Sequence, residues 1–169
     1  MAEKTVDFIA LGRVSKRAEL KSIRLAAVSA KCENAVPGPL EPSLEPDCSV
    51  VSREANTLRV ACSYRFAARV GQVQVAEATM KYLMDYEIAG AEPLEEGDVS
   101  EFSFASGVLH SWPFVRELLY SLTARMGYPP YTLPVYHFVP KPRPKRKDEG
   151  KPKPASTEEG PDSTASPSS

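Results

Sequence analysis

Side chains that commonly carry catalysis are few in this 169-residue chain, and none stands in a familiar catalytic spacing. His110 and His137 are the only histidines, and neither lies in the HxxH or HExxH spacing of a zinc site. The sequence also lacks the GxSxG, GxxxxGK(S/T) and GxGxxG motifs of hydrolases and nucleotide-binding proteins. We therefore predict a protein that is not an enzyme and has no cofactor, with two ordinary histidines. An enzyme with an unrecognised site is the third hypothesis, behind the two given below.

The cysteines are Cys32, Cys48 and Cys62. Their number is odd and none of them forms a CxxC pair, so the pattern favours neither a disulfide framework nor a zinc site. We expect buried or idle thiols in a reducing compartment.

Apolar and aromatic residues are instead abundant in the C-terminal part of the domain. They are Phe102, Phe104, Val108, Leu109, Trp112, Phe114, Tyr120, Tyr128, Tyr131, Tyr136 and Phe138. One helix cannot cover a face of a four-stranded sheet, and soluble monomers rarely expose large apolar patches. We expect about half of these residues to form the core and the rest to form an oligomer interface and a binding groove.

Two long strands are the clearest elements. Residues 57–70 alternate apolar with polar side chains, and residues 76–88 do so again after a turn at Gly71-Gln72. The short connection predicts an antiparallel hairpin. Val73 and Val75 have the opposite parity, which indicates a bulge or a change of covered face near Ala76.

The segment before this hairpin has a less regular pattern. Residues 19–33 carry apolar side chains at both parities, which indicates a strand covered partly on both faces, with a helix as the alternative. Prolines at 37, 39, 42 and 46 predict a loop, followed by a short strand over residues 48–52. The count is four strands in a meander, after a short helix over residues 6–11.

Two helices are predicted after the hairpin. Gly97-Asp98 followed by Glu101 resembles a capping box, which predicts a short helix ending near residue 107. A longer helix is expected from Pro113 to about residue 126, stopped by Gly127. Residues 131–138 are expected to be extended.

Charge and composition divide the chain into an N-terminal segment (1–17), a domain (18–138) and a tail (139–169). Residues 141–169 hold seven basic and five acidic residues and six prolines but no aromatic or large aliphatic side chain, so we predict a disordered, solvated tail that is free to bind an acidic partner as its alternative role. The other 140 residues have a net charge of −3, which argues against nucleic-acid binding. Neither a secretion signal nor a long apolar run occurs, so we expect a cytoplasmic protein without membrane insertion.

The C-terminal helix and its exit resemble a known family. Residues 111–117 (SWPFVRE), 122–127 (LTARMG) and 129–134 (PPYTLP) are similar in type and spacing to the C-terminal core of the SecB export chaperones. Four strands followed by a short helix precede this core in both, so the resemblance covers roughly residues 18–138. It implies an α+β fold in which a four-stranded antiparallel sheet is backed by a short and a long C-terminal helix, assembled as a homotetramer that is a dimer of dimers.

The resemblance also implies a function. SecB proteins hold unfolded precursors in apolar grooves between helix and sheet, without ATP, and pass them to the SecA motor. Here the groove and the core would be drawn from one pool of residues, namely Phe102, Phe104, Trp112, Phe114, Leu118, Leu122, Tyr128, Tyr131 and Leu133. Among them Trp112, Tyr128 and Tyr131 are expected to be exposed near the loop and to contact clients.

Two hypotheses follow for the function. The first is a cytosolic holdase that keeps unfolded or precursor polypeptides competent for export. The second is a dedicated chaperone of one partner, such as the antitoxin of a toxin–antitoxin pair. SecB proteins carry acidic SecA-docking residues on the first strand, and the matching positions here are Ala27 and Lys31, which argues against docking to SecA by that route. Arg116 is the candidate for a residue at the subunit interface.

Overall fold

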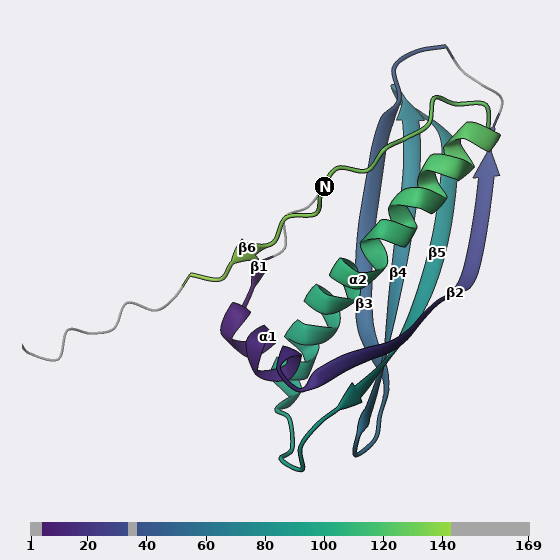
Figure 1. The fold of residues 1–169 in the computed structure, drawn as a ribbon. Helices are drawn as coiled ribbons and strands as arrows, with labels where there is room; N and C mark the ends of the chain where they lie inside the picture. Colours follow the sequence, from purple (N-terminus) through teal and green to yellow (C-terminus); the bar gives the residue numbers. More distant parts are fainter. Residues whose placement is uncertain (1–4, 34–36, 143–169) are drawn as a thin grey trace, which may run out of the picture.

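The computed structural model describes residues 5–33 and 37–142 and contains the predicted four-stranded antiparallel sheet. The strand order is β2-β5-β4-β3, and a long helix, α2, lies across one face (Figure 1). The elements of this unit are β2 (Ala18–Cys32), β3 (Glu41–Arg53), β4 (Thr57–Val70), β5 (Val73–Ile88) and α2 (Glu96–Arg125). The core lies between α2 and the sheet and is formed largely by the alternate side chains predicted for β4 and β5. The predicted α+β fold class is thereby confirmed.

The β4–β5 hairpin has the predicted turn and the predicted bulge. Val70 pairs with Val73 across the turn, where Gly71 adopts a φ of 58° that favours glycine. Ala68 pairs with Ala76 while Arg69 pairs with Gln74, so Val75 is the extra residue of a bulge. This bulge explains why the alternation of apolar and polar residues changes parity at Val75.

Strand β2 explains the mixed pattern of residues 19–33. Its pairing with β5 shifts once between Leu20 and Ser22 and again between Leu25 and Ala27. Each irregularity moves the following residues to the other parity, so apolar side chains at both parities reach the same face. The segment is a strand and not a helix. It is also an edge strand, and most of it is exposed.

Strand β3 is longer than the prediction of a short strand over residues 48–52. It has 13 residues and includes Pro42 and Pro46, which were expected to lie in a loop. Proline cannot donate a hydrogen bond to a neighbouring strand, but an edge strand has one side without a neighbour. Because β3 pairs only with β4, it accommodates both prolines.

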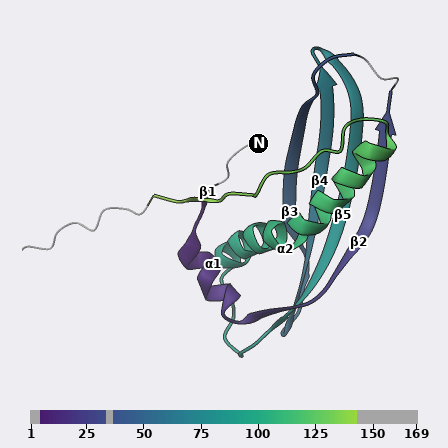
Figure 2. The ribbon, with the colours of Figure 1, turned by 45° about the horizontal axis from the view of Figure 1, so that its top comes forward.

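Helix α2 is one continuous helix of 30 residues, whereas two separate helices were predicted. Pro113, the expected start of the second helix, lies inside it. Figure 2 shows the helix changing direction part-way along, as expected where proline removes one backbone hydrogen bond. The predicted capping box is wrong, because the helix begins after Glu95 and Asp98 makes no cap.

Asp98 instead holds the N-terminal helix α1 (Phe8–Ser15), which begins later than the helix predicted over residues 6–11. Two atoms of the Arg13 guanidinium lie 2.5 Å from the Asp98 carboxylate oxygens. This contact lowers the pKa of Asp98. The side chain of Asp7 caps α1 by accepting hydrogen bonds from Ile9 and Ala10 backbone N–H groups.

The two ends of the described chain also meet. Strand β1 (Thr5–Val6) pairs in parallel with β6 (Val139–Pro140), and the side chains of Lys141 and Glu101 form an ion pair. The N-terminal segment therefore packs on the domain. Most of the predicted disordered tail lies outside the described residues.

The prediction of free thiols is wrong for two of the three cysteines. Cys48 on β3 pairs directly with Cys62 on β4, and the two form a disulfide. Sequence spacing could not show this, because the strand register decides which side chains lie opposite one another. Cys32 is a free and exposed thiol.

In the described part of the chain, no helix is both long and apolar enough to cross a membrane.

Candidate functional site

An apolar groove lies where the C-terminal end of α2 meets the sheet. Its cavity volume is about 540 Å³. Four parts of the chain form it: the adjoining ends of β4 and β5, the last turn of α2, the segment after α2, and the proline-rich segment that leads into β3. The lining residues are Phe66, Ala68, Ala76, Thr123, Tyr128, Pro129, Pro130, Tyr131, Pro37, Gly38, Pro39, Leu40 and Pro42.

The aromatic walls of the groove are held by specific contacts. The ring of Tyr131 packs on Phe66 with centroids 5.8 Å apart. The backbone N–H of Tyr131 donates to the hydroxyl of Thr123 at 2.9 Å, and that hydroxyl in turn donates to the Leu119 carbonyl at 2.8 Å. The Tyr128 hydroxyl donates to the Val75 carbonyl at 3.4 Å, so the bulge in β5 also supports this end of the groove.

The groove has no charged side chain in its lining. Burial raises the pKa of Tyr131 above its usual range. Phe66 and Ala68 are 3% exposed, whereas Tyr128 and Tyr131 are half-buried, so the floor is closed and the tyrosine wall can reach a ligand. Such a surface can bind apolar side chains of an extended chain.

The predicted pool of groove and core residues divides clearly. Phe102, Phe104 and Leu133 are at most 5% exposed and belong to the core. Trp112 is only 7% exposed, so its predicted exposure is wrong. Its indole N–H donates to the Pro134 carbonyl at 3.0 Å and fixes the segment that follows α2.

The remaining members of the pool lie at three places. Tyr128 and Tyr131 line the groove and are half-buried, and their contact with clients stays a prediction. Phe114 and Leu118 line a smaller cavity of about 210 Å³ between α2 and β2. Leu122 is half-buried against the core.

Several groove residues were not singled out in the sequence. Phe66 and Ala68 looked like ordinary core residues of a strand, and the prolines at 37, 39 and 42 looked like a loop. Two proline-rich segments, one before β3 and one after α2, were a signal in the sequence. Only the fold shows that both lie beside the same end of the sheet.

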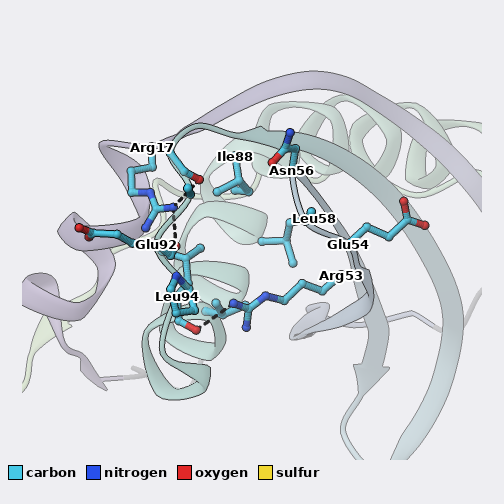
Figure 3. A pocket seen from close by; sticks show the side chains of 13 residues that line it. Arg17, Arg53, Glu54, Asn56, Leu58, Ile88, Glu92 and Leu94 are labelled. Atoms are coloured by element: carbon cyan, nitrogen blue, oxygen red, sulfur yellow. Dashed lines mark hydrogen bonds between the residues drawn. The ribbon is translucent and has the colours of Figure 1, made fainter.

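A second cavity, of about 560 Å³, is at the opposite end of α2 and has a different character (Figure 3). Its cations already have partners, because Arg17 donates to the Ala89 and Glu92 carbonyls at 2.6 and 2.8 Å and Arg53 to the Leu94 carbonyl at 2.8 Å. These bonds hold the loop between β5 and α2. We assign them a structural role.

The histidines do not form a catalytic pair. The ring Nδ1 of His110 lies 2.9 Å from the Tyr86 hydroxyl, and burial lowers the pKa of His110, which favours the neutral ring. His137 is exposed. Within residues 5–33 and 37–142, no group of three or more His, Cys, Asp or Glu side chains could hold a metal ion.

Comparison with known proteins gives the same relationship in sequence and in structure. Proteins named SecB-like chaperone, Rv1957 and its counterpart in a second strain of Mycobacterium tuberculosis, are 27% identical to this chain over 148 residues. The match covers 73% of this chain and 80% of each relative. A solved structure of Rv1957 in complex with a ChAD peptide from the Rv1956 HigA1 antitoxin is 25% identical, with a TM-score of 0.70. It covers 76% of this chain and 97% of that chain. The chain is similar to SecB-like chaperones in both sequence and fold.

No family model matches the chain, so the SecB-like assignment rests on these relatives and on the fold. The relatives are chaperones, which sets the SecB-like family apart from enzymes. The resemblance found in residues 111–134 is thereby confirmed.

The SecB-like fold also places the two positions that matched SecA-docking residues. Ala27 and Lys31 lie on β2, paired with Lys81 and Glu77 of β5. Nζ of Lys31 lies 3.4 Å from a carboxylate oxygen of Glu77. This part of β2 therefore presents no acidic cluster. Arg116 is exposed on α2 and makes no hydrogen bond or ion pair with any described residue.

Proposed function

We propose that this protein is an ATP-independent chaperone that binds an unfolded or extended polypeptide segment in the apolar groove. The observation that carries the proposal is the groove itself, which is lined by aromatic and proline side chains on a SecB-like fold. A client that buries four or five apolar side chains gains about 1.5–3 kcal/mol for each. Ordering and association offset much of this gain, so one groove binds with modest affinity.

The groove is compatible with two kinds of chaperone, which differ in how many clients they bind. A general holdase would bind many precursors destined for Sec-dependent export, and a dedicated chaperone would bind a single partner. The structure of the Rv1957 relative holds an antitoxin peptide, which favours an antitoxin as the partner of the dedicated form. The positions of Ala27 and Lys31 add no support for a SecA-docking surface. We therefore propose the dedicated form as a full second candidate beside the general holdase.

We also propose that the protein assembles as a homo-oligomer through β2 and the adjoining face of α2, in the dimer of dimers that the SecB resemblance implies. The two edges of the sheet differ: β3 contains two prolines, which protect an edge from pairing, and β2 contains none. Leu25, Val28 and Phe114 are 44–48% exposed on this side. A second copy that covers them would remove apolar surface from water, and several grooves in one assembly would raise the avidity for long clients.

Aggregation of a denatured test protein checks the chaperone proposal. The purified chain should suppress aggregation without ATP, and Tyr131→Ala should weaken suppression because it removes the ring that packs on Phe66. Tyr120→Ala is the matched control, because Tyr120 is exposed on α2 and is not part of the groove lining. Absence of suppression at several-fold molar excess of chaperone would contradict the holdase.

A pull-down from the native cytosol distinguishes the two client ranges. A single stoichiometric partner supports the dedicated chaperone, and a broad set of unfolded precursors supports the holdase.

Analytical ultracentrifugation tests the assembly, in which Arg116→Ala is expected to lower the mass at fixed concentration. An unchanged mass of the assembly would show that Arg116 does not stabilise the subunit interface.

A further inference from the structure

The Cys48–Cys62 disulfide lies directly beneath α2. Cys62 is fully buried and Cys48 is half-buried on the edge strand β3. We propose that this disulfide is a redox-sensitive element that sets how α2 is seated on the sheet and thereby controls the apolar groove. The proposal rests on the proposed function for its consequence in client binding, although the seating of α2 can be measured without a client.

Close contact at Gly107 is the first observation behind the proposal. A Cβ atom placed on Gly107 would lie 2.5 Å from Sγ of Cys62 and 3.3 Å from Sγ of Cys48. The backbone of α2 therefore rests on the two bonded sulfurs without room for a methyl group. Two sulfurs that are not bonded to each other need a wider separation than a bonded pair. Because α2 closes the space above them, we expect reduction to displace either α2 or β3.

A continuous set of contacts leads from this place to the groove. On β4, Cys62, Tyr64 and Phe66 share the face that α2 covers, and Phe66 is the residue on which Tyr131 packs. On α2, the hydroxyl of Ser111 donates to the Gly107 carbonyl and lies 2.6 Å from the Tyr64 hydroxyl. A shift of α2 at Gly107 therefore disturbs the helix and the strand that both form the groove.

The exchange reaction is a two-electron thiol–disulfide exchange with a dithiol reductant. A thiolate of the reductant attacks Sγ of Cys48, the S–S bond breaks, and Cys62 leaves as a thiolate that takes up a proton. The second thiol of the reductant attacks the mixed disulfide, releases Cys48 as a thiolate that is also protonated, and ends as the oxidised cyclic disulfide. A disulfide oxidant reverses the sequence.

Burial makes this reaction depend on α2. Cys62 must leave as a thiolate in apolar surroundings, which disfavour the charged form. Reduction is therefore expected to need movement of α2 away from the sheet. A ligand in the groove that holds α2 in place should slow reduction, and reduction should weaken the binding of that ligand, since coupling between two sites is reciprocal.

The test uses the full chain in an oxidised form and in a form treated with dithiothreitol. Alkylation with iodoacetamide followed by mass spectrometry counts the free thiols in each form. Hydrogen exchange is measured over residues 104–112, and the affinity for a fluorescein-labelled, aromatic-rich unstructured peptide is measured by anisotropy. We expect one free thiol before treatment and three after it, faster exchange in the reduced form, and about 5-fold or more weaker peptide binding.

Cysteine variants supply the controls. Cys32→Ser should keep the full redox response, and the double variant Cys48→Ser/Cys62→Ser should match the reduced form under both conditions. Three free thiols in the oxidised preparation, or equal exchange over residues 104–112 in both forms, would overturn the proposal. If the peptide binds neither form, the proposed client function fails, and the exchange measurement still decides whether the disulfide seats α2.

Discussion

The two halves of α2 differ in what covers them. In the half before Pro113, Phe102, Ser103 and Phe104 are at most 5% exposed, and α1 and the segment after α2 close over this part of the helix. In the half after Pro113, Phe114 and Tyr120 are 46% and 51% exposed. Apart from Leu109, which is 61% exposed, the first half of the helix is therefore enclosed by its own chain, whereas the second half leaves apolar surface open.

Because of this difference, one part of α2 contributes mainly to the stability of the fold and the other mainly to the binding of partners. The enclosed half carries the large buried side chains, the Asp98–Arg13 pair and the contact with the disulfide. The open half carries one wall of the groove and the surface next to β2. We expect substitutions in the first half to affect unfolding and those in the second half to affect partners.

The largest effect is expected for Phe102→Ala. Phe102 is 2% exposed and packs edge-to-face on Tyr86 with ring centroids 5.0 Å apart. Removing a buried phenylalanine ring costs about 3–5 kcal/mol of the free energy of unfolding. Urea unfolding at one fixed protein concentration measures this, with Tyr120→Ala in the open half expected to stay within about 0.5 kcal/mol. Equal losses for the two variants would refute the division of α2.

Gly107→Ala should have the next largest effect. The new methyl group would meet the disulfide sulfurs, and such overpacking costs about 1–3 kcal/mol. The matched control is Gly97→Ala in the same helix, where no atom lies within 4 Å of the added Cβ. Because alanine favours a helix more than glycine does, the control should be neutral or stabilising. Thermal unfolding of the oxidised proteins gives the comparison, and a loss in both variants would argue against close contact at Gly107.

Asp98→Asn should have a smaller effect that depends on pH. Arg13 lowers the pKa of Asp98 in the folded state, so the ion pair stabilises the fold above the unfolded-state pKa of about 4. That contribution is lost as the pH falls through the lower folded-state pKa. The difference in melting temperature between wild type and Asp98→Asn should therefore shrink below about pH 4. Asp47→Asn, at an exposed position on β3, is the control, and a difference independent of pH would contradict the role of the pair.

Phe114→Ser should change the stability of the subunit least. Its ring is 46% exposed and lies beside Tyr82, with centroids 6.3 Å apart. We expect little change in unfolding of the isolated subunit but a lower assembly mass in analytical ultracentrifugation, because the variant removes apolar surface next to β2. A large loss of stability at an unchanged mass would show that Phe114 belongs to the core instead.

Local pattern was sufficient for the elements that obey one rule along their whole length. Residues 57–70 and 76–88 alternate in type because one face of each strand packs under α2, so strands, hairpin and bulge were all predictable. The prolines of β3 and the Pro113 of α2 misled the prediction. Proline disrupts a strand or helix only where its missing N–H would have had a hydrogen-bond partner. Whether a partner exists depends on the neighbouring strands or on the rest of the helix, which a local sequence pattern does not show.

The candidate site could likewise be predicted from the sequence only where local pattern was sufficient. Tyr128 and Tyr131 were found from their position after the helix, next to a proline pair that ends it. Trp112, by contrast, was expected to be exposed, and the structure buries it under the segment containing Pro134, to whose carbonyl its indole N–H donates. The binding role of the tyrosines stays a prediction.

The sequence by itself determined the SecB-like relationship, the hairpin and the presence of more apolar surface than one helix can cover. These features depend on residue type and on spacing within single segments. The tertiary structure alone decided that Cys48 and Cys62 are bonded, that Asp98 pairs with Arg13, and that two proline-rich segments meet Phe66 in one groove. Each of these depends on which residues, far apart in the chain, the strand register and the packing of α2 bring together.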